Sequence, residues 1–456
     1  MLRIVMMTSG EAVVALSSNE FEEHAARGEN TIRDMKKLLV AITGLPRFRQ
    51  RLLQNGEVLE DDVQIHLPAL LHLVLLSFCD NDPLRLDKFE TALMHDDVQA
   101  VERFLQQPGD PNQEVRRMTC LCLAAGAGSF RSAQLLVEAM ADLRRSERRF
   151  GSTPLHLASL AGHTNIARWL LESRADIRAG EREGTTALHL ASCHGHAEVV
   201  QVLIGAGGRD CGFLHAEGWL GATPLHQACL MGQVETSQLL IRADADINRT
   251  TREGLTALGV ACRSGRHEIV SLLLDLRADL EKVDQKGRTP LIWACYAEHI
   301  DVVRHLLNAG AEKTPRDSDG HSALHIAISV GSRSLTGLLL EARADIEEKA
   351  AGGQTPLCRA CVLGHTELTR FLLDHGCNKE HTDEEGRRPL MIACLAGHTE
   401  IVRVLTERGA NAQIRLGMSS PLDAARCFGH WEIQEILLRS AQERAPKRRR
   451  RVKGPP

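Results

Sequence analysis

Apolar and polar residues recur at a spacing that predicts pairs of short helices along most of the chain. In one such pair, Thr153 is suited to cap a helix and Pro154 to open it, because the first helical residue needs no N–H partner. Apolar residues follow at helical spacing over 155–158 and again over 166–171, with Gly162 between the two runs. Neither helix can bury its apolar face alone, so each pair is expected to pack against its neighbours.

The pattern returns at a nearly constant period. Successive copies open on Thr-Pro-Leu-His or a close variant at residues 153, 186, 223, 256, 289, 322 and 355, and Pro389-Leu390 opens a further copy. The steps between copies are 33 residues, apart from one of 37. A fixed period of this size predicts a stacked array, whose main function is to offer a long surface.

The repeated Thr-Pro-Leu-His and Gly-His…Leu-Leu segments resemble those of the ankyrin repeat. Nine or ten copies carry the match from about Arg116 to about Arg439, and a degenerate first copy over residues 84–112 would act as a cap. The resemblance implies a mainly α fold, an ankyrin-repeat α-solenoid of about ten or eleven helix-turn-helix repeats. It also implies a surface that binds proteins.

The chain departs from the family pattern in two places. Four charged residues stand where the family usually has glycine after the second helix: Arg174, Asp244, Arg277 and Arg343. That position favours left-handed backbone geometry, so each is expected to cost roughly 1 kcal/mol. An insertion over 207–221 stretches one repeat, and we expect a longer finger there with Phe213 and Trp219 exposed.

The first eighty residues follow a different pattern. Period-two apolar runs and one amphipathic run with Thr31 as its N-cap predict strand, strand, helix, strand, strand over residues 2–6, 12–16, 31–42, 50–53 and 71–75. This order resembles ubiquitin, as do the segments Gln50-Arg51-Leu52-Leu53, Leu59-Glu60-Asp61 and Leu71-His72-Leu73-Val74-Leu75. The resemblance covers residues 1–78 and implies a small α+β β-grasp domain with a longer connection over 17–30.

Ubiquitin's partners bind an apolar patch whose positions map onto Leu53, His72 and Val74. The resemblance therefore implies ubiquitin-binding proteins as partners. The alternative is that Leu53 and Val74 are merely outward strand residues. The conjugating Arg-Gly-Gly tail has no counterpart over 77–82, so the segment is interpreted as a built-in module.

The composition indicates the cellular compartment in which the protein acts. The chain has 13 cysteines, an odd number, and five share one repeat position: Cys229, Cys262, Cys295, Cys361 and Cys394. We find no signal peptide and no apolar run of membrane length, so we expect the cytoplasm or nucleus, with thiols as core hydrophobes and no membrane insertion. Net charge is −4 and aromatic residues are 3%, which argues against specific nucleic-acid binding.

Candidate chemistry is sparse. Cys358 and Cys361 have the Cys-x-x-Cys spacing of redox or zinc sites, but no second ligand pair accompanies them. No phosphate loop or nucleophile elbow is present. Acids in the turns are spread along the array and are interpreted as a solvated rim: Glu181, Asp284, Asp319 and Glu384. We therefore expect no enzyme activity, no catalytic residue, no cofactor, no metal and no small-molecule substrate.

Histidines also follow the repeat. Eleven of the 21 fall at two fixed positions, which are His156, His189, His226 and His325 in one, and His163, His196, His267, His299, His365, His398 and His430 in the other. A metal or catalytic site would need a single cluster. A repeated histidine is interpreted as a hydrogen-bonding residue that ties turn to helix.

The residues just before the mid-repeat glycine point to the concave side of an ankyrin stack. Here they are Leu160, Leu230, Met231, Arg263, Tyr296, Val330, Val362, Leu363, Leu395 and Phe428. The set is more apolar than solubility requires, which predicts a protein-binding groove. The alternative is that several of them pack between neighbouring helices. The turn tips lean basic, which favours an acidic or extended peptide: Arg182, Arg252, Lys286, His321 and Arg387.

A basic run follows the last repeat. Lys447, Arg448, Arg449, Arg450 and Arg451 come after a proline and resemble a monopartite nuclear import signal, which implies an import receptor as partner. The alternatives are a solvated charged tail, an acidic-lipid contact and non-specific RNA binding.

These patterns predict four segments. They are a head over 1–79, a linker with the degenerate capping repeat over 80–115, the repeat array over 116–440 and a disordered basic tail over 441–456. The leading hypothesis is a non-enzymatic scaffold or adaptor that binds a protein through the concave face and turn tips. The alternative is a ubiquitin-system adaptor, in which the head docks to a proteasome or ligase component while the repeats hold cargo.

Overall fold

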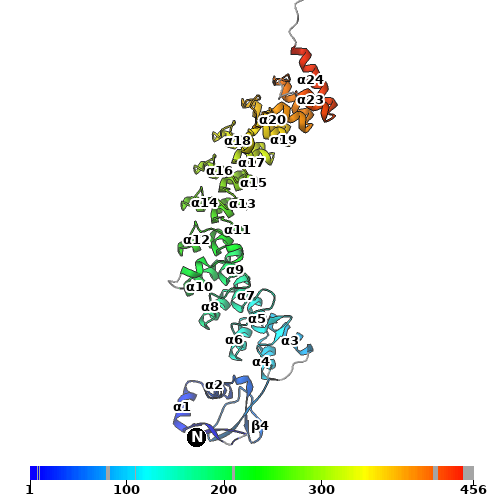
Figure 1. Cartoon of the computed structure of the whole chain (residues 1–456). Helices are drawn as coiled ribbons and strands as arrows, with labels where there is room; N and C mark the ends of the chain where they lie inside the picture. The colour runs from blue at the N-terminus through cyan, green and yellow to red at the C-terminus, as the bar shows by residue number, and fades with distance from the viewer. Residues whose placement is uncertain are drawn as a thin grey trace, which may run out of the picture. The chain divides into compact units, whose positions relative to one another are not determined.

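The computed structural model describes residues 1–7, 9, 11–78, 83–107, 109–207, 211–413 and 420–444. They divide into two compact units. Unit 1 comprises residues 1–228 and 235–245, and unit 2 comprises residues 229–234 and the described residues from 246 onwards. Figure 1 shows the helices and strands of both units and labels most of the helices.

The head of unit 1, residues 1–78, is a five-stranded mixed sheet with two helices. Its elements are β1 (Leu2–Met6), β2 (Ala12–Leu16), α1 (Ser18–Ala26), α2 (Ile32–Thr43), η1 (Arg47–Arg49), β3 (Gln50–Gln54), β4 (Glu57–Val58) and β5 (Ala69–Leu75). The strand order is β2-β1-β5-β3-β4, with β1 parallel to β5 and the other pairs antiparallel. This arrangement is β-grasp-like, as the element order predicted.

The alternation of buried and accessible residues along the strands shows which face of the head sheet is buried. Leu52, Leu71 and Leu73 are at most 1% exposed and belong to a core that also contains Met35 and Leu39 of α2. The intervening residues of β3 and β5 therefore lie on the other face. The sequence did not predict α1, which fills the longer connection and begins with a capping box formed by Ser17 and Glu20.

Paired helices follow the head. They are α3 (Pro83–Met94), α4 (Val98–Gln106), α5 (Cys120–Ala127), α6 (Phe130–Glu138), α7 (Pro154–Ala161), α8 (Thr164–Glu172), α9 (Ala187–His194), α10 (Ala197–Gly207), α11 (Pro224–Met231) and α12 (Val234–Arg242). Short elements lie in the turns: β6 (Glu114–Val115), β7 (Met118–Thr119), η2 (Cys211–His215) and η3 (Trp219–Gly221). In unit 1, first helices α3, α5, α7 and α9 pack in sequence, and so do second helices α4, α6, α8 and α10.

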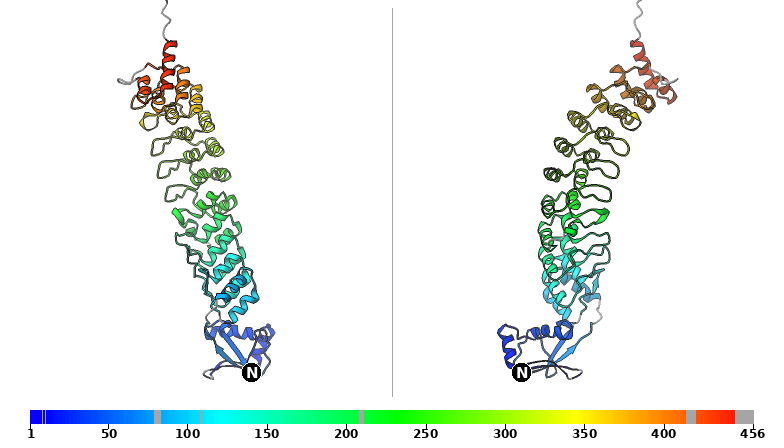
Figure 2. Two further views of the ribbon diagram at one scale, coloured as in Figure 1. Left: turned by 90° about the vertical axis from the view of Figure 1, so that its right-hand side faces the viewer. Right: turned by 60° about the vertical axis from the view of Figure 1, so that its left-hand side comes forward.

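Unit 2 repeats the same packing. Its helices are α13 (Ala257–Arg263), α14 (His267–Asp275), α15 (Pro290–Tyr296), α16 (Ile300–Asn308), α17 (Ala323–Ser329), α18 (Arg333–Glu341), α19 (Pro356–Leu363), α20 (Thr366–Asp374), α21 (Pro389–Ala396), α22 (Thr399–Glu407), α23 (Pro421–Cys427) and α24 (Trp431–Arg444), with η4 (Ala351–Gly353) in a turn. First helices α13 to α23 contact one another in sequence, as do second helices α14 to α24. Figure 2 shows these rows from two further sides.

The mid-repeat glycine is fixed by two constraints. Gly162 has φ +77°, and a Cβ placed on it would lie 2.6 Å from Nδ1 of His196 in the next repeat. Any other side chain would thus meet both a backbone penalty and an imidazole ring. The prediction of left-handed geometry at four charged positions is confirmed, with φ of 67° at Arg174, 68° at Asp244, 58° at Arg277 and 63° at Arg343.

The expectation for the inserted finger is wrong for one of its two aromatic residues. Trp219 is exposed, whereas Phe213 is only 5% exposed. The Phe213 ring covers Gly207 at the end of α10, where an added Cβ would lie 2.1 Å from the ring. The insertion therefore folds back on its own repeat, because burying the ring removes apolar surface from water.

Candidate protein-binding surfaces

The predicted groove residues lie in a row on the first helices, and none of them is buried. We call the members in unit 2 the first-helix strip. Within it Met231, Tyr296, Val362, Leu363 and Phe428 are exposed. Half-buried members are Leu230, Arg263, Val330 and Leu395. Leu160, the one predicted residue in unit 1, is half-buried at the end of α7. The strip thus presents exposed apolar side chains on alternate repeats, with Arg263 or a half-buried apolar residue on the repeats between them.

Two aromatic residues in the strip region are anchored. The Tyr296 hydroxyl donates to Asp317 Oδ2 at 3.1 Å. Burial and the charge of Asp317 raise the pKa of Tyr296 to about 12. Trp293, one helical turn earlier, donates from Nε1 to Asp284 at 3.2 Å and lies under the Arg288 guanidinium at 3.8 Å. The aromatic part of the strip is therefore rigid, which lowers the entropy lost on binding.

The interpretation of the turn acids as a solvated rim is wrong for Asp284, which is 6% exposed. Its carboxylate accepts the backbone N–H groups of Lys286 and Arg288, at 2.8 and 2.9 Å. Asp317 does the same in its own turn for Asp319 and His321. These carboxylates therefore fix the geometry of the turns.

Asp317, Asp319 and His321 lie close enough to share a cation. The oxygens of Asp317, however, already accept hydrogen bonds from the turn N–H groups and from the Tyr296 hydroxyl.

Most of the repeated histidines hold turns to helices, as predicted, but the prediction is wrong for His267, because Arg266 occupies the repeat position there and donates to the Leu230 carbonyl. His189 Nδ1 lies 3.1 Å from the Thr186 backbone N–H, which can only donate, so Nδ1 is the acceptor. Nε2 then carries the proton and donates to the Ala222 carbonyl at 2.9 Å. The second set bonds across repeats, as when His398 Nε2 donates to the Val362 carbonyl at 3.2 Å. Burial lowers the pKa of His189 and that of His325 to about 4.

The Cys-x-x-Cys pair is buried on α19. Cys358 and Cys361 are fully covered, and burial raises the pKa of both thiols. A thiol held protonated is a poor nucleophile and a poor metal ligand. The pair therefore serves as small apolar core residues.

The head carries a second candidate surface. Leu53 pairs directly with His72 across β3 and β5, and Val74 lies two residues further along the same face, so the sheet brings the three predicted residues together. All three are half-buried. The sequence analysis missed Leu70 on the same face of β5 and Val58 opposite Leu53, which are 49% and 54% exposed. Continued period-two alternation was the signal that could have included them.

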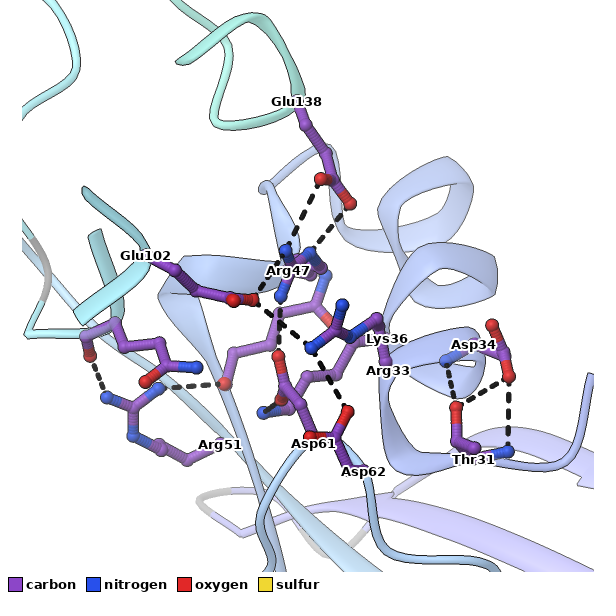
Figure 3. Close-up of polar contacts among 12 residues, drawn as sticks. Thr31, Arg33, Asp34, Lys36, Arg47, Arg51, Asp61, Asp62, Glu102 and Glu138 are labelled. Carbon is purple, nitrogen blue, oxygen red and sulfur yellow. Dashed lines mark hydrogen bonds and ion pairs between the residues drawn. The ribbon is translucent and has the colours of Figure 1, made fainter. Parts of the chain in front are cut away.

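The junction between the head and the first repeats is charged and buried. Figure 3 shows Arg47 between three carboxylates. It donates to Asp61 of the head at 2.5 Å, to Glu102 of α4 at 3.0 Å and to Glu138 of α6 at 2.6 Å. The Arg47 side chain is 1% exposed. One guanidinium therefore joins the head to two successive repeats.

Neighbouring groups extend the junction. Phe48 is 3% exposed and belongs to the core cluster of the first repeats together with Phe89 and Leu93. Arg51 donates to the Gln106 carbonyl at the C-terminal end of α4, where the helix dipole favours a cation. Apolar burial and charge pairing thus act together at this contact.

Lys36 completes the charge balance inside the head. Its Nζ lies 2.5 Å from Asp61 Oδ1, and its side chain is 4% exposed. Burial lowers the pKa of Lys36. Burial also acts to raise the pKa of Asp61, but the hydrogen bond and charge of Lys36, together with the charge of Arg47, outweigh it and leave that pKa lowered. Asp61 is therefore an ionised carboxylate that pairs with both Lys36 and Arg47.

Comparison with protein families settles what the repeats are. A model of three ankyrin repeats matches overlapping blocks at residues 89–181, 143–213, 174–251, 238–317, 276–350, 324–415 and 379–446. The chain belongs to the ankyrin-repeat family. Ankyrin repeats generally mediate protein–protein interactions, and the family is typically non-enzymatic. A comparison with curated proteins finds no match. No helix among the described residues has the length and apolar character to cross a membrane.

Proposed function

We propose that this ankyrin-repeat protein is a non-enzymatic scaffold or adaptor whose first-helix strip binds a protein partner. The observation that carries the proposal is the row of exposed apolar side chains on alternate repeats of unit 2, at α11, α15, α19 and the end of α23. Phe428 is 62% exposed, Met231 45% and Leu363 42%. Exposed apolar residues that form a row, rather than being scattered singly, mark a binding surface. Its place of action is the cytoplasm or nucleus.

Serine at Met231, Val362, Leu363 and Phe428 is expected to abolish partner capture while leaving the melting temperature unchanged. These side chains contribute apolar area to a complex but little to the repeat core. Tyr296 is left intact because its hydroxyl bonds to Asp317. The readout is mass-spectrometric comparison of proteins captured by the wild-type and variant chains.

Leu276→Ser with Ile300→Ser is the matched control, since both residues are exposed but lie at the second helices α14 and α16. We expect the control to capture the same proteins as the wild type. If the strip variant is folded and captures the same proteins as the wild type, the strip is not the binding surface.

We infer a second role for the head from the five apolar or aromatic side chains gathered on one face of its sheet. They are Leu53, Val58, Leu70, His72 and Val74. In this role the head docks to a ubiquitin-binding component of a proteasome or ligase while the repeats hold cargo. The run from Lys447 to Arg451 lies outside the described residues, and its role in nuclear import stays a prediction.

Leu53→Ala in the full chain is expected to weaken binding of a ubiquitin-interacting-motif peptide by on the order of tenfold, because it removes the central apolar contact. Fluorescence anisotropy of the labelled peptide measures this. Ile42→Ala is the control, because Ile42 is 56% exposed but lies on α2. Absence of peptide binding to the wild-type chain would exclude the second role and leave the first untouched.

A further inference from the structure

Three consecutive turns of unit 1 carry exposed arginines. These turns precede first helices α5, α7 and α9. Their tips hold five exposed arginines, which we call the fingertip arginines: Arg116, Arg117, Arg148, Arg149 and Arg182. Successive tips therefore present positive charge on one edge of the repeats.

Backbone hydrogen bonds join these tips to one another. The Arg148 N–H donates to the Arg117 carbonyl at 3.2 Å, and the Arg182 N–H donates to the Phe150 carbonyl at 3.0 Å. The Arg182 guanidinium also donates to the Arg148 carbonyl at 2.8 Å. The arginines consequently form one continuous surface rather than three separate sites.

The central tip is rigid. Glu147 is buried beneath it, and its carboxylate accepts the backbone N–H groups of Arg149, at 2.6 Å, and of Phe150. Burial acts to raise the pKa of Glu147, but these hydrogen bonds outweigh it and leave that pKa lowered. Glu147 thus remains a carboxylate that serves the loop, and its charge is not presented at the surface.

Arginines outnumber exposed carboxylates at these tips, where Glu183 is exposed next to Arg182. Arg116 pairs with Glu90 at 3.1 Å and Arg148 with Glu114 at 2.7 Å. Among the described residues, Arg117, Arg149 and Arg182 have no carboxylate within ion-pair distance. Between them lies the Phe150 ring, which is 53% exposed and sits 4.8 Å from the Arg149 guanidinium.

We propose that the fingertip arginines bind an extended acidic segment of a protein partner, with Phe150 contacting an apolar side chain of that segment. Guanidinium groups match carboxylates with paired hydrogen bonds, and unpaired arginines on a rigid loop are ready to accept them. Phe150 is the only aromatic side chain at these tips, whereas single-stranded nucleic acid needs several aromatic rings to stack its bases. The proposal rests on the protein-binding role but uses a different surface from the first-helix strip.

The test measures binding of a fluorescein-labelled poly-Glu peptide interrupted by leucine to the full chain. The variant R117E/R149E/R182E is expected to weaken binding by on the order of a hundredfold, and added salt is expected to weaken wild-type binding. The control R103E/R131E/R168E makes the same charge change at exposed arginines of α4, α6 and α8 and is expected to bind like the wild type. Circular dichroism verifies that all chains are folded.

An equal loss of peptide binding in the two charge-reversed variants would overturn the proposal, because it would show that binding responds only to the net charge of the protein. So would tighter binding of a single-stranded RNA oligonucleotide or of phosphatidylserine vesicles than of the peptide. The strip variant serves as a further comparison. We expect it to keep peptide binding, so that failure of the strip and failure of the fingertip surface are told apart.

Discussion

Arg47→Met is expected to destabilise unit 1 by about 2–3 kcal/mol, the largest effect of any single substitution considered for this protein. The Arg47 side chain is 1% exposed, and its removal leaves Glu138 without an ion-pair partner, whereas Glu102 keeps Arg33 and Asp61 keeps Lys36. A buried charge that loses its partner keeps its desolvation cost but loses its attraction. Urea unfolding followed by circular dichroism measures the loss.

Two further variants separate the junction from a general charge effect. Arg27→Met removes an exposed head arginine and is expected to change stability by less than about 0.5 kcal/mol. Adding Glu102→Gln and Glu138→Gln to Arg47→Met is expected to recover part of the loss, because both side chains are then neutral. A loss from Arg47→Met no larger than that from Arg27→Met would show that the junction does not hold the head to the repeats.

Acidification from pH 7 to pH 5 is expected to remove about 2 kcal/mol of stability for each of His189 and His325. Their folded pKa is about 4, whereas an unfolded histidine titrates near 6.5. Between these two pKa values the unfolded state binds more protons than the folded state. The stability that each neutral histidine contributes is therefore fully present above the unfolded pKa, and it is lost as the pH falls toward the folded pKa. Urea midpoints at several pH values record the slope.

Glutamine is the informative replacement at both positions. Its amide can accept from the turn N–H and donate to the facing carbonyl as the neutral imidazole does, but it does not titrate. His189→Gln with His325→Gln should therefore reduce the slope between pH 6.5 and 4, and the remainder is expected from His156 and His321, whose pKa values burial also lowers. His305→Gln, at an exposed site on α16, should leave the slope unchanged. An unchanged slope in the double variant would assign the acid sensitivity to other groups.

The sequence predicted the local architecture because its causes are local. A threonine cap, a proline at the first helical position and a glycine between the helices recur in many of the copies, and each acts within a few residues. The left-handed geometry at Arg174 and Arg343 was likewise predicted from their place in the repeat. The resemblance to ubiquitin grouped Leu53, His72 and Val74 in one patch, and the strand pairing does bring them together on one face of the head.

Contacts between residues far apart in the chain could not be predicted from the sequence. Arg47 meets Glu102 and Glu138, which are 55 and 91 positions away, and a single sequence does not show which distant groups will meet. A local sign was present, because the apolar Phe48 lies in the short connection between the predicted helix and the next predicted strand. Phe213 was misplaced for a different reason: its partner Gly207 is close in sequence, but the path of the inserted segment that returns the ring to it follows no repeat pattern.

Site-specific photo-crosslinking in cells tests the central claim most directly. A photoreactive amino acid is placed at Leu363 or Phe428 in the strip, or at Leu276 or Ile300 on the second helices. The account predicts a discrete crosslinked protein from the strip positions, absent from the second-helix positions and lost when the other strip residues are changed to serine. The same crosslinks from both rows, or crosslinks from the second helices alone, would contradict it.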